Sequence, residues 1–154
     1  MCSSDLGCRG ILFKDEGPRF GLGSFKSVGA VYAMIRHIER LSGARVDAAK
    51  ALRGGYAKLM RDQVFATATS GNHGRALAWV SQCVGARCII YAPSECSEGR
   101  IEAMRKFGAE IVRTGLLYNP AMNLCRKDCR KNGWTLFADT SWDDYQEIPM
   151  DIMT

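Results

Sequence analysis

The sequence lacks any continuous apolar run of the roughly 18 or more residues that a membrane span requires. Residues 1–10 have neither the basic start nor the apolar core of a secretion signal. The 154 residues are 47% hydrophobic and 24% charged, which is ordinary for one globular domain with a real core. We therefore expect a cytoplasmic protein without a membrane partner.

The sequence also lacks a CxxC pair, and its seven cysteines are odd in number. Both features argue against a zinc site and against a disulfide framework. Cys125 and Cys129 lie four residues apart beside Met122, so they fall on one helical stripe and are expected to fill core. We expect reduced thiols and no metal.

A concentrated basic surface is missing as well, although the net charge is +5. Lysines and arginines are mixed with acids over residues 36–40 and 98–106, as on solvated helix faces. Only residues 126–131 are locally basic, around Asp128. We therefore expect no nucleic-acid partner.

From residue 63 onward, apolar runs of strand length alternate with segments of helical period. This pattern predicts an α/β fold in which a parallel sheet has helices on both faces, giving three layers. Ser97 is expected to cap one helix and Gly108 to end it. The predicted strands are residues 64–67, 87–92, 110–114 and 134–139. The first predicted helix follows residue 74 and ends at about residue 84, and the second covers residues 98–107. The third begins near Pro120 and ends before Gly133.

The front of the chain is different, because one strand over residues 11–16 and two helical segments cannot close a domain. The first helix is predicted over residues 24–41, and the second, over 44–63, is broken at Gly54-Gly55. The inward positions expected for the first helix are Val28, Val31, Ile35, Ile38 and Leu41. We expect an incomplete large-domain portion over 1–61, a small four-stranded α/β domain over 62–145, and the start of a continuation over 146–154.

Lys26 follows Gly23-Ser24-Phe25 at the start of the first predicted helix. The positive end of the helix dipole disfavours an ammonium there, and a neutral amine is what a Schiff-base nucleophile requires. Ser24 is positioned to cap the helix, and the glycines let the backbone approach a planar cofactor. The alternatives are a solvated lysine near a helix start, or a nucleotide-binding loop. The nucleotide fingerprint, however, would place its third glycine at Lys26.

A second motif runs from Ser70 through Gly71, Asn72 and His73 to Gly74, between a predicted strand and a helix. Backbone N–H groups at such a helix start bind an anion such as a substrate carboxylate. Asn72 offers a donor to a cofactor oxygen. Simple helix capping by Ser70 and Asn72, and a surface position for His73, are the alternatives.

The two motifs together resemble those of pyridoxal-phosphate (PLP) dependent enzymes related to tryptophan synthase β-subunit and the serine/threonine dehydratases. Within that group, residues 14–22 and the long insert over 41–63 are similar to the diaminopropionate ammonia-lyases, since dehydratases have a shorter connection. The same similarity covers Asp139-Thr140-Ser141-Trp142, Tyr145 and Ile148-Pro149.

This resemblance implies a PLP cofactor bound by Lys26, with Phe25 and Asn72 beside it, and Asp139 as a second catalytic group that transfers protons. Ser70, Gly71 and His73 are the implied substrate-binding residues. The implied reaction is β-elimination of the small amino acid diaminopropionate to pyruvate and ammonia, in a homodimer. Ser70 departs from the aspartate common in that family, and a serine cannot act as a comparable base. We therefore expect activity on the L-isomer but not on the D-isomer.

The resembled enzymes hold the cofactor phosphate in a glycine-rich loop that follows the region matched here, and the only adjacent glycine pair in this chain is Gly54-Gly55. We therefore expect a fragment with the large domain incomplete, weak PLP binding and impaired activity. The alternatives are a serine/threonine dehydratase-like PLP enzyme, a noncatalytic α/β interaction module, and a nucleotide-binding protein.

Overall fold

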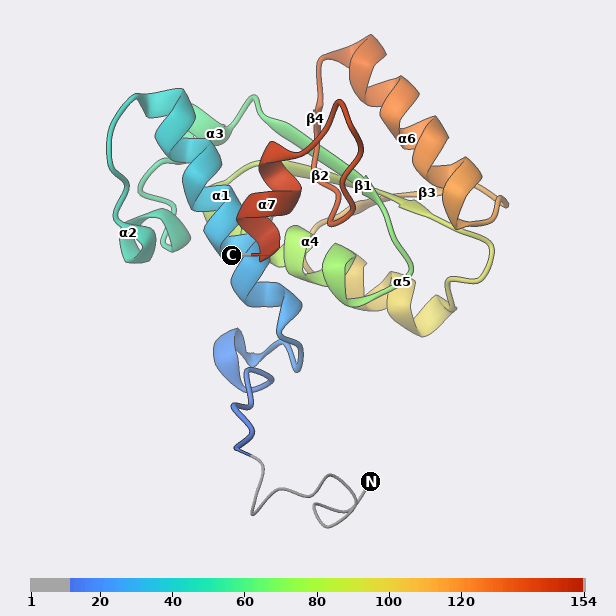
Figure 1. Cartoon of the computed structure of the whole chain (residues 1–154), viewed down its shortest axis with the longest axis horizontal. Coiled ribbons are helices and arrows are strands. Elements are labelled where there is room, and N and C mark those ends of the chain that lie inside the picture. The colour runs from blue at the N-terminus through green and yellow to red at the C-terminus, as the bar shows by residue number, and fades with distance from the viewer. Residues whose placement is uncertain (1–11, 154) are drawn as a thin grey trace.

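The computed structural model describes residues 12–153, which form a four-stranded parallel sheet covered by helices (Figure 1). The strand order is β3-β2-β1-β4, with β1 and β2 in the centre. Because all four strands are parallel, their carboxyl ends meet at one edge of the sheet, where ligands bind in open α/β folds. The strands are β1 (Val64–Ala68), β2 (Arg87–Ala92), β3 (Glu110–Arg113) and β4 (Thr135–Leu136).

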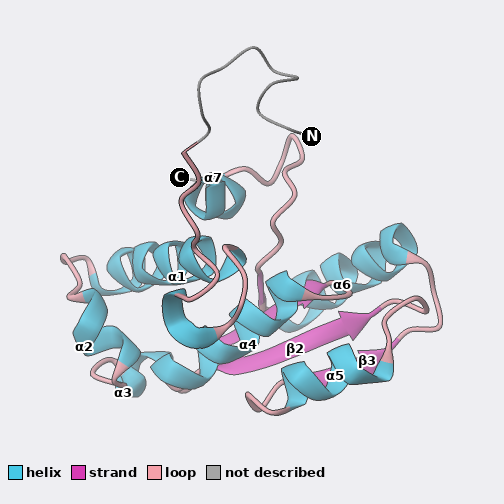
Figure 2. Cartoon of the chain, turned by 90° about the horizontal axis from the view of Figure 1, so that it is seen from below, coloured by secondary structure: helices cyan, strands magenta, loops and turns pink. Residues whose placement is uncertain are grey.

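Helices cover both faces of the sheet, which confirms the predicted three-layer α/β architecture. The alternation of strand side chains sends Phe65 and Ile90 into a core shared with α1, α4, α5 and α7. It sends Ala66 and Ile89 to the other face, against α6. Figure 2 shows α4 and α5 alongside β2 and β3. The helices are α1 (Lys26–Ser42), α2 (Ala48–Leu52), α3 (Ala57–Met60), α4 (Asn72–Val84), α5 (Glu98–Arg105), α6 (Tyr118–Asn132) and α7 (Glu147–Met153), after a short 3-10 turn at Arg19–Gly21.

Helix α1 begins at Lys26, two residues after its predicted start. The Lys26 N–H donates to the Ser24 hydroxyl oxygen at 3.2 Å, and the Ser27 hydroxyl donates to the Ser24 carbonyl at 2.8 Å. The predicted inward residues Val31, Ile35 and Ile38 are buried, and Val28 is partly buried. Leu41 is 42% exposed, so its predicted core position is wrong. The last turn of α1, before left-handed Gly43, lies at the surface.

The segment between α1 and β1 follows the prediction of two helical pieces separated by Gly54-Gly55. Helix α2 is capped by the Asp47 side chain, which accepts the Lys50 N–H at 2.8 Å. Gly54 has a φ of 77° and lies near the carbonyl of Cys83, at the end of α4. The glycine pair therefore packs at the far end of α4 from His73, about 15 Å along the helix.

Two strand predictions need correction. Residues 12–16 form no strand, and Ile11 lies outside the described residues. A strand needs a hydrogen-bonded neighbour. The edge strands of the sheet formed by residues 12–153 are β3 and β4, and residues 12–16 pair with neither of them. The strand predicted over 134–139 is limited to Thr135–Leu136, because it pairs only with β1. One further bond, from the Phe137 N–H to the Ala66 carbonyl at 2.8 Å, extends that pairing.

The prediction for Ser97 is correct in place but not in mechanism. Ser97 precedes α5, and its side chain makes no cap hydrogen bond. Its backbone carbonyl instead accepts the N–H groups of Arg100 and Ile101 at 3.0 and 3.1 Å. Gly108, with a φ of 78°, follows the helix in the left-handed conformation expected for it.

The predicted thiol stripe is confirmed, since Met122, Cys125 and Cys129 are buried against the sheet. The five cysteines of the described part of the chain are unpaired, and residues 12–153 contain no cluster suited to a metal ion. Over the same residues, no helix combines the length and the apolar character that crossing a bilayer would demand.

Candidate active site

Three side chains from distant parts of the chain converge at the carboxyl edge of the sheet. Lys26 is the first residue of α1, His73 is the second of α4, and Asp139 follows β4. The Lys26 Nζ lies 2.8 Å from Asp139 Oδ2, although the two residues are 113 positions apart. The structure thus brings together the two residues predicted to be catalytic.

His73 lies behind Asp139 and has little access to solvent, with 4% of its side chain exposed. Its Nε2 is 2.7 Å from the Phe137 carbonyl oxygen. Its ring stacks on the Phe137 ring, with centroids 6.3 Å apart and planes inclined by 17°. Its Nδ1 faces Asp139 Oδ2 at 3.9 Å. The imidazole is therefore fixed in orientation, with one nitrogen directed at the carboxylate.

The surroundings set the charge of these groups. Burial lowers the pKa of His73, opposed by Asp139 and assisted by the positive charge of Lys26. Burial acts to raise the pKa of Asp139, but His73 and the hydrogen bond from Lys26 outweigh it, and this pKa lies below its usual value. At neutral pH the site therefore holds a neutral imidazole beside a carboxylate that is paired with the Lys26 amine.

A cavity of about 260 Å³ opens beside the Lys26 amine. It is lined by Phe25, Lys26, Gly29, Asp139, Ile152 and Met153. The Phe25 ring is 67% exposed, and the Lys26 Nζ lies 5.4 Å from its centroid. The amine thus meets open space on one side and a carboxylate on the other.

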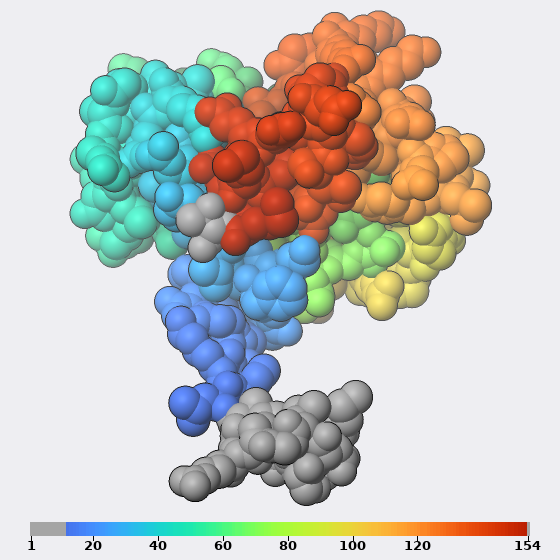
Figure 3. Space-filling view, viewed as in Figure 1, coloured from blue at the N-terminus to red at the C-terminus, as the bar shows by residue number. Residues whose placement is uncertain are grey.

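Helix α7, which the sequence did not predict, forms one wall of this cavity. It packs against α1, where a Cβ on Gly29 would lie 2.1 Å from the Ile152 carbonyl oxygen. In Figure 3 the red C-terminal segment lies against the blue and cyan segment that includes α1. The spacing of Ile148 and Ile152, four residues apart, was an available signal for a helix with one buried face.

The Ser70-Gly71-Asn72 segment lies at the carboxyl end of β1. The Ser70 carbonyl accepts from Arg100 Nη1 at 3.3 Å and from the Cys96 thiol at 3.7 Å. Asn72 begins α4 and is exposed, and within residues 12–153 its side chain makes no hydrogen bond. First-turn N–H groups of a helix lack acceptors inside the helix, so they remain available to an anion. These three residues are therefore open to a ligand, and among residues 12–153 no hydrogen bond joins them to Lys26.

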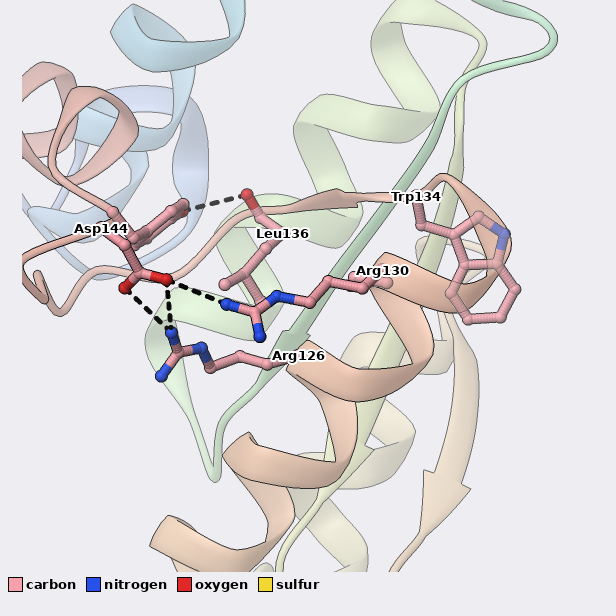
Figure 4. A pocket seen from close by; sticks show the side chains of 7 residues that line it. Arg126, Arg130, Trp134, Leu136 and Asp144 are labelled. Carbon is pink, nitrogen blue, oxygen red and sulfur yellow. Dashed lines mark hydrogen bonds and ion pairs between the residues drawn. The ribbon is translucent and has the colours of Figure 1, made fainter.

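The segment that carries Asp139 is held by a network that the sequence did not reveal. The Tyr145 hydroxyl accepts the Ala138 N–H at 2.9 Å and donates to the Leu136 carbonyl at 3.0 Å. Arg126 and Arg130 of α6 both donate to Asp144, at 3.1 and 2.9 Å, beside a pocket of about 180 Å³ (Figure 4). The resemblance singled out Tyr145, whereas no pattern pointed to the two arginines.

The donor set fits a cofactor that carries an aldehyde. A primary amine is the group that condenses with an aldehyde, and the Lys26 side chain is 33% exposed beside the cavity. The buried His73 Nδ1 has no hydrogen-bond partner among the described residues, so the site keeps a free proton acceptor behind Asp139. The amine and the buried acceptor are thus compatible with a PLP-type cofactor.

The sequence profile of the family described as "Pyridoxal-phosphate dependent enzyme" matches residues 2–148. Among curated proteins, the diaminopropionate ammonia-lyase of Salmonella typhimurium (strain LT2) is 38% identical over 159 residues, covering 98% of this chain and 38% of the relative. The Escherichia coli K12 protein of the same name is 35% identical, covering 99% of this chain and 39% of the relative. The chain thus spans about two fifths of the length of these relatives.

Solved structures give the same result. The apo form of the Escherichia coli diaminopropionate ammonia-lyase superposes with a TM-score of 0.80 at 34% identity. The superposition covers 91% of this chain and 38% of that one. The described fold therefore corresponds to one part of a longer protein of known architecture.

Proposed function

The chain belongs to the family of pyridoxal-phosphate dependent enzymes, and on that basis we propose that its site serves the elimination of ammonia from a small diamino acid. The proposed overall reaction converts diaminopropionate and water to pyruvate and two molecules of ammonia. The observation that carries the proposal is the Lys26 amine, 2.8 Å from Asp139 beside a cavity of about 260 Å³.

The residues that would hold the cofactor are Lys26, through its amine, with Phe25 and Asn72 beside it. When bound, the cofactor withdraws electrons from the bond that is broken at the substrate α-carbon. Asp139 holds the Lys26 amine in place and takes or returns a proton at Oδ2. The open N–H groups after Ser70 and Gly71 orient a substrate carboxylate. His73 supports Asp139 from the buried side, where it acts on the substrate only indirectly.

The test is covalent attachment of PLP to the 154-residue chain. We expect an absorbance band that depends on Lys26, and borohydride reduction should fix the added mass on the Lys26 peptide. Lys26→Ala should abolish both signals. Lys50→Ala, which removes an exposed lysine on α2, is the matched control and should leave both unchanged. Equal labelling of the Lys26→Ala variant would contradict the proposal.

A serine/threonine dehydratase activity is the second candidate, and Ser70 is the observation that favours it. The Ser-Gly-Asn-His-Gly order at residues 70–74 is the form that resembles the dehydratases, whereas the ammonia-lyases commonly place an aspartate first. Assaying pyruvate and 2-oxobutyrate released from diaminopropionate, serine and threonine separates the two candidates.

Further features of the whole protein complete the proposal. We propose that the chain divides near residue 61 into a large-domain portion, a small α/β domain over 62–145 and a continuation over 146–154. The five unpaired cysteines among residues 12–153 support a reducing compartment such as the cytoplasm. The proposed partners are a small amino acid and a second copy of the protein.

A further inference from the structure

His73 has a buried nitrogen that the proposed reaction does not yet use. The Phe137 carbonyl can only accept a hydrogen bond, so the His73 Nε2, at 2.7 Å, must carry a proton. In the neutral ring the lone pair is then on Nδ1. That atom is buried, and no donor among residues 12–153 reaches it.

The carboxylate oxygen that faces this lone pair is also the partner of the site lysine. Asp139 Oδ2 lies 3.9 Å from His73 Nδ1 and 2.8 Å from the Lys26 Nζ. An ionised carboxylate has no proton to offer the lone pair, whereas a protonated one has. A closure of about 1 Å would bring the two atoms within hydrogen-bond distance. Asp139 is ionised at rest, and the lone pair on His73 Nδ1 can accept an O–H bond only after Asp139 takes up a proton.

We propose that His73 Nδ1 accepts a hydrogen bond from Asp139 whenever Asp139 takes up a proton from Lys26, so that His73 acts as a positioning residue through Asp139. The transfer from Lys26 rests on the proposed function. In the step, an N–H bond of the Lys26 ammonium breaks as an O–H bond forms on Asp139. That O–H then donates to His73 Nδ1, and the reverse movement returns the proton to the amine. No other reactant is needed.

The groups that face His73 are few, which makes its titration a direct test. They are the Asp139 carboxylate, the Lys26 amine and the uncharged Phe137 carbonyl. Asp139 favours the charged imidazole and Lys26 disfavours it, while burial lowers the pKa of His73 overall. The two charged neighbours thus act with opposite signs.

The experiment is a titration of the ¹⁵N-labelled 154-residue chain, followed by NMR at the histidine ring nitrogens. The sequence has two histidines. His37 packs its ring on Phe65 and is not among the groups that face Asp139, so it is an internal control. We expect neutral His73 to carry its proton on Nε2. Asp139→Asn should move the titration midpoint of His73 to lower pH, and Lys26→Met should move it to higher pH. The titration midpoint of His37 should be unchanged in both variants.

A neutral His73 protonated on Nδ1 would overturn the proposal, as would shifts of the same sign in the two variants or shifts no larger than those of His37. If Asp139→Asn does not fold, the tautomer of the unmodified chain and the Lys26→Met shift still decide. The titration is independent of the proposed function. Failure of PLP to attach to Lys26 would sink that function and leave the histidine shifts intact, whereas absent shifts would sink only the proposed role of His73.

Discussion

At the scale of single residues, the Tyr145 hydroxyl stabilises the backbone that leads to Asp139. It satisfies the Ala138 N–H and the Leu136 carbonyl, which both lie in the short segment between β4 and Asp139 or at its start. We expect Tyr145→Phe to lower the free energy of unfolding by about 1–3 kcal/mol, because it leaves a buried donor without an acceptor. Chemical denaturation of the two proteins measures this difference.

Tyr118→Phe is the matched control for that variant. The Tyr118 side chain is partly buried on α6, and its hydroxyl makes no hydrogen bond among residues 12–153. Its removal should change the free energy of unfolding by less than about 0.5 kcal/mol. Equal losses in the two variants would show that ring packing, not the hydroxyl, supports the Asp139 segment.

Ser70 determines which substrate isomer we expect to react. Ser70→Asp should add turnover of D-diaminopropionate, because a carboxylate accepts a proton at neutral pH and a serine hydroxyl does not. The measurement is pyruvate released from each isomer. Ser94→Asp places the same change after the neighbouring strand β2 and should add no such turnover. Equal rates on both isomers before any substitution would count against the expectation.

At this scale the sequence named most of the site but not its arrangement. Lys26 was recognisable from its place at a helix start, and Asp139 from its motif. Their contact depends on β4 lying beside β1, a pairing between segments far apart in the chain. The depth of His73 was also hidden, because burial by Phe137 is set by that same pairing. Local patterns carry no information about such distant neighbours.

At the scale of elements, the contact between α1 and α7 depends on a glycine. A Cβ at position 29 would collide with the Ile152 carbonyl, so we expect Gly29→Ala to displace α7 and cost about 1–3 kcal/mol of stability. Gly99→Ala in α5 is the control. No atom lies within 4 Å of its added Cβ, and a helical alanine should stabilise by about 0.5–1 kcal/mol. Thermal unfolding should therefore move in opposite directions in the two variants.

Elements with their own local signals were predictable, and those defined by neighbours were not. Strand β2 has the predicted bounds, because its apolar run ends at Pro93. Helix α7 was missed because Pro149 sits inside it, although a proline in the first turn is tolerated where no N–H bond is needed. The supposed strand over 11–16 had the right residue types but found no partner over its described part.

At the scale of the whole molecule, burial of titratable groups sets a pH window for stability. Burial lowers the pKa of His37 and His73 below the ordinary 6.5, so each resists protonation in the fold. Their stabilising contribution is present above pH 6.5 and is lost as the pH falls. Burial raises the pKa of the Cys88 thiol to about 12, so its contribution is lost as the pH rises above 9.0.

We therefore expect the free energy of unfolding to be greatest between about pH 7 and 8.5 and to fall on both sides. Urea unfolding at a series of pH values measures this curve. His37→Gln should reduce the loss of stability below about pH 7 only in part, because His73 contributes to the same loss. A stability that rises steadily from pH 7 to pH 5 would contradict the assignment of both histidines as buried and neutral.

The separation of 113 positions between Lys26 and Asp139 also fixes the order and the interval in which the two residues are synthesised. A ribosome adds about 5–20 residues per second, so roughly 6–23 seconds separate the synthesis of the two residues. During that interval the Lys26 side chain lacks the carboxylate with which it pairs in the fold. Only when β4 aligns on β1 does Asp139 reach the amine. The nascent chain thus carries Lys26 without its carboxylate partner, and the pairing of β4 with β1 supplies that partner.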